Sequence, residues 1–100
     1  MKRRVRWFRE AIEDLTSHVT YVAVDSPASA RMIVTRLRQA GDDLALFATG
    51  RPGRMASTFE RVLADIPYTI VYSEDVIAGE EVISILRVVH HAQRWPPDEN

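Results

Sequence analysis

The chain has 100 residues, of which 46% are hydrophobic, and a formal net charge of -1 at pH 7, as expected for one small globular domain with a single core. No apolar run approaches the length that spans a membrane, and the nearly neutral charge argues against a general, charge-driven nucleic-acid-binding protein. The chain contains no cysteine, so we expect no disulfide, no thiolate metal site and a cytoplasmic location.

The first half of the chain predicts a short strand followed by two helices. A weak alternation over residues 4–8 predicts the strand, and an apolar stripe predicts a helix over residues 10–24. The stripe consists of Ala11, Ile12, Leu15, Val19 and Val22. The opposite, polar face of this helix consists of Glu10, Glu13, Asp14 and Ser17.

A second helix is expected directly after the first. Ser26 can cap its free amides and Pro27 suits its first turn. Its apolar residues recur every three or four positions and are Ala30, Ile33, Leu37, Ala40, Leu44 and Phe47. This stripe is typical of a helix packed on a core, although it would also suit a homodimer or a groove for a partner.

The second half of the chain predicts three strands. Residues 50–54 form a glycine- and proline-rich loop, residues 58–63 and 68–73 are predicted strands, and residues 75–80 are a predicted turn into a last strand that begins at Val82. The order β-α-α-β-β-β predicts an α+β fold of two layers, in which an antiparallel helical hairpin covers one face of a mostly antiparallel sheet. Residues 1–96 would form this single domain and residues 97–100 a short disordered tail.

The last strand suggests the position of a functional site. Residues 82–89 are mostly apolar at odd- and even-numbered positions alike, which is typical of a strand covered on both faces, and Arg87 is the single charge among them. A guanidinium in a buried strand either pairs inside the fold or points into a cleft that receives an anion. His90, His91, Arg94 and Trp95 follow directly, and these residue types suit contact with phosphate or with an acidic partner.

Arg61 is a candidate partner of Arg87. If the last three strands form a meander, the two guanidinium groups could converge across the middle strand and grip RNA phosphate or an acidic surface. Alternatively, Arg61 pairs with a carboxylate such as Glu60 or Glu74, and Arg87 ties the tail to the sheet.

The remaining candidates lie in the tail and in the loop. His90 and His91 are neighbours and should point to opposite faces, so we expect no metal site; either could transfer protons or simply close the strand. Arg51 and Arg54 in the loop either contact a partner or are solvated. Trp95 either packs the tail on the core or meets a partner.

Five segments taken together resemble the RelE/ParE toxin superfamily of bacterial toxin-antitoxin modules, and most closely its ParE-like, plasmid-stabilisation branch. They cover residues 11–15, 25–30, 50–54, 67–72 and 85–96. The resemblance implies a compact toxin, neutralised by an antitoxin that folds over the helical hairpin and the sheet. The nuclease branch has an arginine where this chain has Thr69, and Lys2 is the only lysine, so the resemblance favours the ParE type.

The resemblance therefore implies a toxin without a cofactor, which inhibits DNA gyrase by binding and makes no bond itself. The contact residues would be Arg51, Arg54, Arg61, Arg87, His91, Arg94 and Trp95. The alternative is a metal-independent, ribosome-dependent endonuclease of messenger RNA, with Arg61, Arg87, His90 and His91 as catalytic residues. A homodimer, a hetero-oligomer with the antitoxin, and an inactive toxin that only binds its antitoxin are also open.

Overall fold

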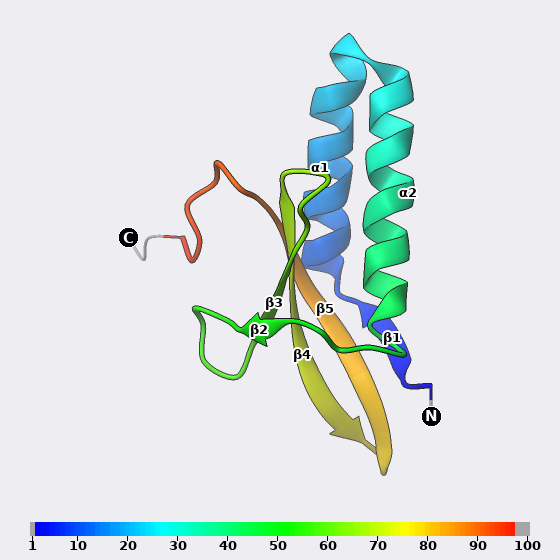
Figure 1. Ribbon diagram of the computed structural model, residues 1–100, viewed down its shortest axis with the longest axis vertical. Helices are drawn as coiled ribbons and strands as arrows, with labels where there is room; N and C mark the ends of the chain where they lie inside the picture. Colours follow the sequence, from blue (N-terminus) through cyan, green and yellow to red (C-terminus); the bar gives the residue numbers. More distant parts are fainter. Residues whose placement is uncertain (1, 98–100) are drawn as a thin grey trace.

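The computed structural model describes residues 2–97 as two helices and a five-stranded sheet (Figure 1). The elements in chain order are β1 (Arg4–Trp7), α1 (Arg9–Asp25), α2 (Pro27–Asp43), β2 (Arg51–Pro52), β3 (Phe59–Val62), β4 (Tyr68–Ile77) and β5 (Glu80–His90). The predicted α+β fold is confirmed, with β2 as an additional two-residue strand in the predicted loop. The predicted tail, residues 97–100, falls outside the described residues except for Pro97.

The sheet is mixed and has the order β1-β5-β4-β3-β2. β3, β4 and β5 form the predicted antiparallel meander, and β1 joins the far edge parallel to β5. The helices lie side by side on one side of the sheet, whereas the C-terminal segment turns away from them (Figure 1). Neither helix in the range 2–97 is long and apolar enough to span a lipid bilayer.

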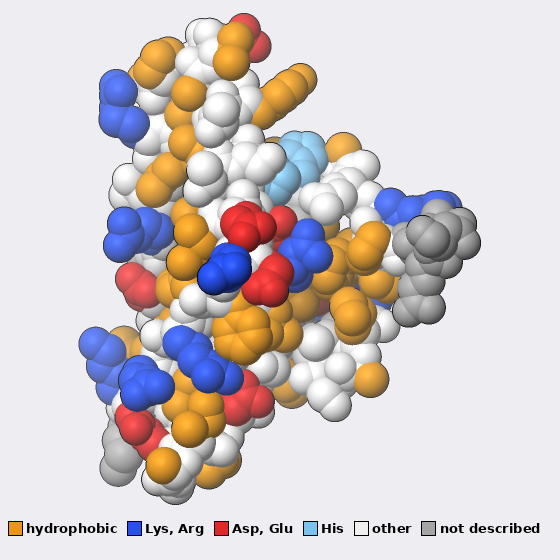
Figure 2. Space-filling view, turned by 180° about the vertical axis from the view of Figure 1, so that it is seen from behind, with side chains coloured by type: hydrophobic (Ala, Val, Ile, Leu, Met, Phe, Trp, Pro, Cys, Tyr) orange, Lys and Arg blue, Asp and Glu red, His pale blue; other side chains and the backbone are white. Residues whose placement is uncertain are grey.

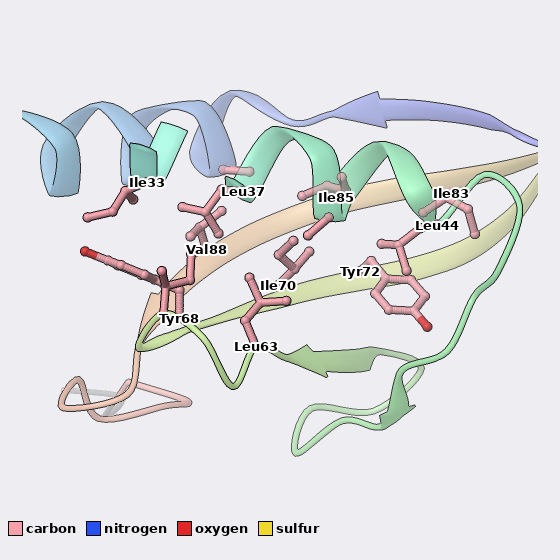
Figure 3. Packing of buried hydrophobic residues seen from close by; sticks show 13 residues of the cluster. Ile33, Leu37, Leu44, Leu63, Tyr68, Ile70, Tyr72, Ile83, Ile85 and Val88 are labelled. Carbon is pink, nitrogen blue, oxygen red and sulfur yellow. The ribbon is translucent and has the colours of Figure 1, made fainter. Parts of the chain in front are cut away.

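The predicted start of α2 is confirmed. The Ser26 hydroxyl accepts a hydrogen bond from the Ser29 amide at 3.2 Å, and Pro27 occupies the first turn. Ile33 and Leu37 of this helix, and Leu44 directly after its last residue, point toward the sheet (Figure 3). Phe47 was wrongly assigned to the same stripe: α2 ends at Asp43, and the Phe47 side chain is 68% exposed.

The orientation of α1 also differs from the prediction. Ala11 is fully buried, but Ile12 is 50% exposed. Asp14, which the periodicity assigned to the solvent face, instead reaches β5 and receives a hydrogen bond from the Val88 amide. Asp14 follows Ala11 by three positions and therefore shares its side of the helix. The buried side of α1 thus includes a carboxylate that the apolar pattern could not reveal.

The hairpin of β4 and β5 is longer than predicted. The expected turn over residues 75–80 is wrong, because β4 continues to Ile77 and pairs with Glu80 of β5. Ala78 and Gly79 form the connection, and both have positive φ, 53° and 78°. Two such residues are typical of a tight hairpin turn whose twist matches the strands.

A bulge in β5 decides which of its side chains reach the core. Val71 of β4 pairs with Arg87 but the next residue, Tyr72, pairs with Ile85, so Leu86 has no partner. An extra residue of this kind reverses the alternation of the strand. Ile85 and Val88 consequently both belong to the core under the helices, and the charged side chain of Arg87 lies on the other face.

We expect Gly41→Ala to destabilise the protein by about 1–3 kcal/mol, because an added Cβ would overlap with the Trp7 ring and with Ile85. The measurement is the free energy of unfolding by chemical denaturation. Arg38→Ala, at an exposed position of the same helix, is the control and should change stability by no more than about 0.5 kcal/mol. Equal stability of the two variants would contradict the packing described here.

Candidate functional site

The sheet face away from the helices carries most of the predicted site residues, but Arg61 is not among them. Register pairs Glu60 with Val71 and Val71 with Arg87, so these three side chains share that face. Arg61 pairs with Ile70, which lies in the core under the helices. The predicted convergence of Arg61 and Arg87 is therefore wrong, because their faces differ.

Arg61 instead binds the C-terminal end of α2. Its Nη1 donates to the Ala40 carbonyl oxygen at 2.7 Å. Carbonyls in the last turn of a helix lack intrahelical partners and favour a nearby cation. The predicted alternative of an ion pair with Glu60 or Glu74 is not found for Arg61, which ties β3 to the helical layer.

Arg87 is held by Asp14 of α1. Its Nε and Nη2 donate to the two carboxylate oxygens at 2.7 and 3.0 Å, and Oδ2 also accepts the Val88 amide at 2.9 Å. The hydrogen bonds to Asp14 raise the pKa of Arg87 against the opposing effect of its burial. The Arg87 side chain remains 31% exposed, so the pair lies at the rim of the face.

Trp95 covers the middle of this face. It is 7% exposed and forms a small cluster with Val71 and Val89. The guanidinium carbon of Arg87 lies 5.3 Å from the centre of its ring, a distance typical of a cation–π contact. Trp95 thus packs the tail on the sheet, and among residues 2–97 its indole Nε1 has no hydrogen-bond acceptor.

A mostly apolar hollow of about 260 Å³ lies beside Trp95 and Arg87. Its other lining residues are Phe8, Glu10, Met55, Thr58, Val71 and Leu86. Leu86 and Arg87 both line it because they are the neighbouring residues of the bulge. The hollow therefore combines apolar walls with one partly exposed guanidinium.

Glu60 organises the two loop arginines. Its side chain is 1% exposed, and its carboxylate accepts the Arg54 Nε and Nη2 at 3.2 and 3.1 Å and the Arg54 amide at 2.9 Å. Arg51 lies 3.7 Å from the same carboxylate. Burial would raise the pKa of Glu60, but the hydrogen bonds from Arg54 and the charges of Arg54 and Arg51 together lower it.

A second, more polar hollow of about 220 Å³ brings Arg51, Arg54 and His91 together. It is also lined by Val62, Thr69, Val89, His90 and Gln93. Thr69 occupies the position at which toxins of the nuclease branch are expected to have an arginine. The hollow is thus lined by two arginines and two histidines, and the buried Glu60 offsets part of the positive charge.

His90 and His91 both line the polar hollow, and β5 ends at His90, so the predicted alternation to opposite faces does not extend to His91. The His90 ring lies against Tyr68, with ring centres 5.1 Å apart, and its Nδ1 accepts the Ala92 amide at 3.0 Å. Burial lowers the pKa of His90, and the nearby charges of His18 and His91 lower it further. His91 is exposed beside the polar hollow, and Arg94 is exposed in the tail. No cluster of three potential metal ligands occurs in the described part of the chain.

The two residues that sequence reasoning missed are the acids Asp14 and Glu60. The spacing of three residues between Ala11 and Asp14 could have indicated that Asp14 lies on the buried side of α1. The alternation of side chains along β3 could have indicated that Glu60 and Arg61 lie on opposite faces. Both acids fix arginines on the open face. Figure 2, seen from behind, shows acidic and basic side chains next to one another near the middle of the molecule.

Glu60→Gln should lower the free energy of unfolding by about 1–2 kcal/mol at pH 7, because a neutral amide replaces the carboxylate that Arg54 binds, while the half-exposed Arg54 side chain can still be hydrated. The pKa of Glu60 is lowered in the folded state, so this stabilisation is present above the unfolded pKa and is lost as the pH falls through the folded value. The difference between the wild type and the variant should therefore shrink below about pH 4. Chemical denaturation at several pH values measures this difference in the free energy of unfolding. A difference that does not change with pH would contradict the role of an ionised Glu60 as the partner of Arg54.

Comparison with known proteins places this arrangement in a family. A family model described as "ParE toxin of type II toxin-antitoxin system, parDE" matches residues 5–95. The protein named "Putative toxin Y4kP" of Sinorhizobium fredii is 44% identical over 98 residues, which cover 95% of each chain. "Toxin RelE2" of Caulobacter vibrioides is 32% identical over 91 residues, which cover 90% of this chain and 97% of that protein.

Solved structures share the fold. A chain of the "Chromosomal ParDE TA system from P. aeruginosa" superposes with a TM-score of 0.74 at 24% identity, covering 89% of this chain and 96% of that one. A chain of the toxin-antitoxin complex RelBE2 from Mycobacterium tuberculosis superposes with a TM-score of 0.59 at 23% identity, covering 90% of this chain and 99% of that one. The match of the family model over nearly the whole chain shows that the protein belongs to the ParE toxin family, the toxins of type II toxin-antitoxin systems.

Proposed function

We propose that this toxin inhibits DNA gyrase by binding to it and makes no covalent bond itself. The observation that supports a binding mechanism most directly is the placement of Arg61 and Arg87 on opposite faces of the sheet. Arg61 is engaged by the end of α2 and Arg87 by Asp14. Arg61 and Arg87 therefore do not form the pair of converging arginines that a phosphate-cleaving site could use to stabilise a pentacoordinate phosphate.

The contact surface for the target is the open sheet face with its two hollows. It presents Arg51, Arg54, Arg87, His91 and Trp95, and the apolar hollow offers room for a side chain of the partner. Central apolar anchors flanked by arginines are typical of protein interfaces. Arg94 in the adjoining tail completes this set, whereas Arg61 no longer belongs to it.

A cognate antitoxin would hold the toxin inactive in the cytoplasm. The helical hairpin offers it an apolar surface, since Tyr21 and Val24 of α1 are 82% and 81% exposed and Met32 of α2 is 56% exposed. A groove of about 450 Å³ is lined by residues of both helices, among them Val19 and Val34. A segment that folds on binding could lay its apolar side chains there.

A ribosome-dependent endonuclease is the second candidate. Two observations favour it: a relative bears the name "Toxin RelE2", and Arg51, Arg54 and His91 line one polar hollow. In this alternative the arginines would stabilise the phosphate and His91 would move the proton of the attacking 2′-hydroxyl. Thr69 at the arginine position of the nucleases argues against it.

Purified toxin added to DNA gyrase and relaxed plasmid should block supercoiling or trap cleaved DNA, because the proposed contact disturbs the working enzyme. Addition of the antitoxin encoded beside the toxin gene should restore supercoiling. The control is an Arg54→Ala/Arg87→Ala variant, which should inhibit much less. Unaffected gyrase, combined with new ends in ribosome-bound messenger RNA by primer extension, would contradict the proposal and support the nuclease.

A further inference from the structure

We propose that Asp14 and Glu60 are positioning residues, which hold Arg87 and Arg54 as two oriented groups for acidic side chains on the surface of the target. The inference rests on the proposed function, since it concerns the same face. Its starting point is a pattern that occurs twice. In both pairs one carboxylate accepts the Nε and Nη2 of an arginine and also a backbone amide.

The carboxylates leave most of each guanidinium available. A guanidinium has five N–H donors, and the forked contact uses two of them, so three remain on the outer edge of each group. The Arg54 and Arg87 side chains are 52% and 31% exposed, whereas the Glu60 and Asp14 side chains are 1% and 16% exposed. The acids thus lie beneath the arginines, and the cations face solvent.

This arrangement lowers the entropic cost of binding. A free arginine side chain loses about 2 kcal/mol of rotamer entropy when a partner immobilises it. Folding has already imposed that order here through Asp14 and Glu60. The Arg3 and Glu74 pair differs, because it has a single long contact of 3.4 Å and no such fork.

The two arginine–carboxylate pairs lie on either side of β4. Glu60, Val71 and Arg87 are successive partners across β3, β4 and β5, so Glu60 and Arg87 are separated by two strand spacings, about 10 Å. Trp95 packs on Val71 between them. The complementary partner is therefore a protein surface with two acidic groups that flank an apolar side chain.

Spectroscopy can test the orientation without reference to the target. In ¹⁵N NMR of the full chain, the Nε–H signals of Arg87 and Arg54, assigned with Arg→Lys variants, should be resolved and slow to exchange with solvent. Asp14→Asn should remove this protection at Arg87 only, and Glu60→Gln at Arg54 only. Fast exchange of both signals in the wild type would overturn the proposal.

Growth arrest on induced expression reports activity whichever target is correct. Asp14→Asn should weaken both growth arrest and gyrase inhibition by about tenfold or more, and Asp14→Glu should restore part of both activities. Ile33→Ala, which destabilises the core away from this face, is the control and should retain arrest as long as it is folded. If Asp14→Asn does not fold, Arg87→Lys tests the same fork, since it keeps the charge and loses the planar geometry.

The outcomes separate the two proposals. Loss of arrest in Asp14→Asn with gyrase unaffected by the wild type would leave the positioning role intact and overturn the gyrase target. Full arrest and full inhibition by Asp14→Asn, Glu60→Gln and Arg87→Lys would show that the two pairs serve stability alone, and would overturn the positioning role. A wild type that causes no arrest would overturn both.

Discussion

The carboxylate of Asp14 joins the two layers of this protein at the point where β5 changes its alternation. The bulge at Leu86 brings Val88 to the core and Arg87 to the open face, and it disturbs the regular ladder there. Asp14 accepts both the Val88 amide and the Arg87 guanidinium. One side chain thus satisfies an irregular backbone, holds a cation that the core could not accept, and fixes α1 on the sheet.

The same solution appears at the other end of the open face, where a buried acid also fixes an irregular segment. Glu60 accepts the Arg54 amide and its guanidinium, and so orders the loop between β2 and β3. The cost of burying each carboxylate is offset by several charge-assisted hydrogen bonds rather than by one. On the open sheet face that results, the guanidinium groups of Arg54 and Arg87 are held in fixed orientations.

Much of the fold could be predicted from the sequence because its periodicity is strong. The stripe of α2, the cap at Ser26 and the three-strand meander follow from local patterns that tertiary packing reinforces. The bulge could not be predicted, because residues 82–89 are apolar at both parities and so give no indication of where the alternation reverses. The length of the β4 and β5 hairpin was also missed: polar residues and Gly79 made residues 75–80 look like a turn, although residues 75–77 belong to β4 and Glu80 begins β5.

The candidate site was predicted in composition rather than in geometry. Arg51, Arg54 and His91 do lie around one hollow, but whether Arg61 and Arg87 share a face depended on the register of β3, β4 and β5, which the sequence does not reveal. The central claim is that Asp14 and Arg87 act as one unit. A double-mutant cycle of Asp14→Ala and Arg87→Ala on the free energy of unfolding at pH 7 tests it most directly. The account predicts a coupling energy of about 1–3 kcal/mol, and additive effects of the two substitutions would contradict it.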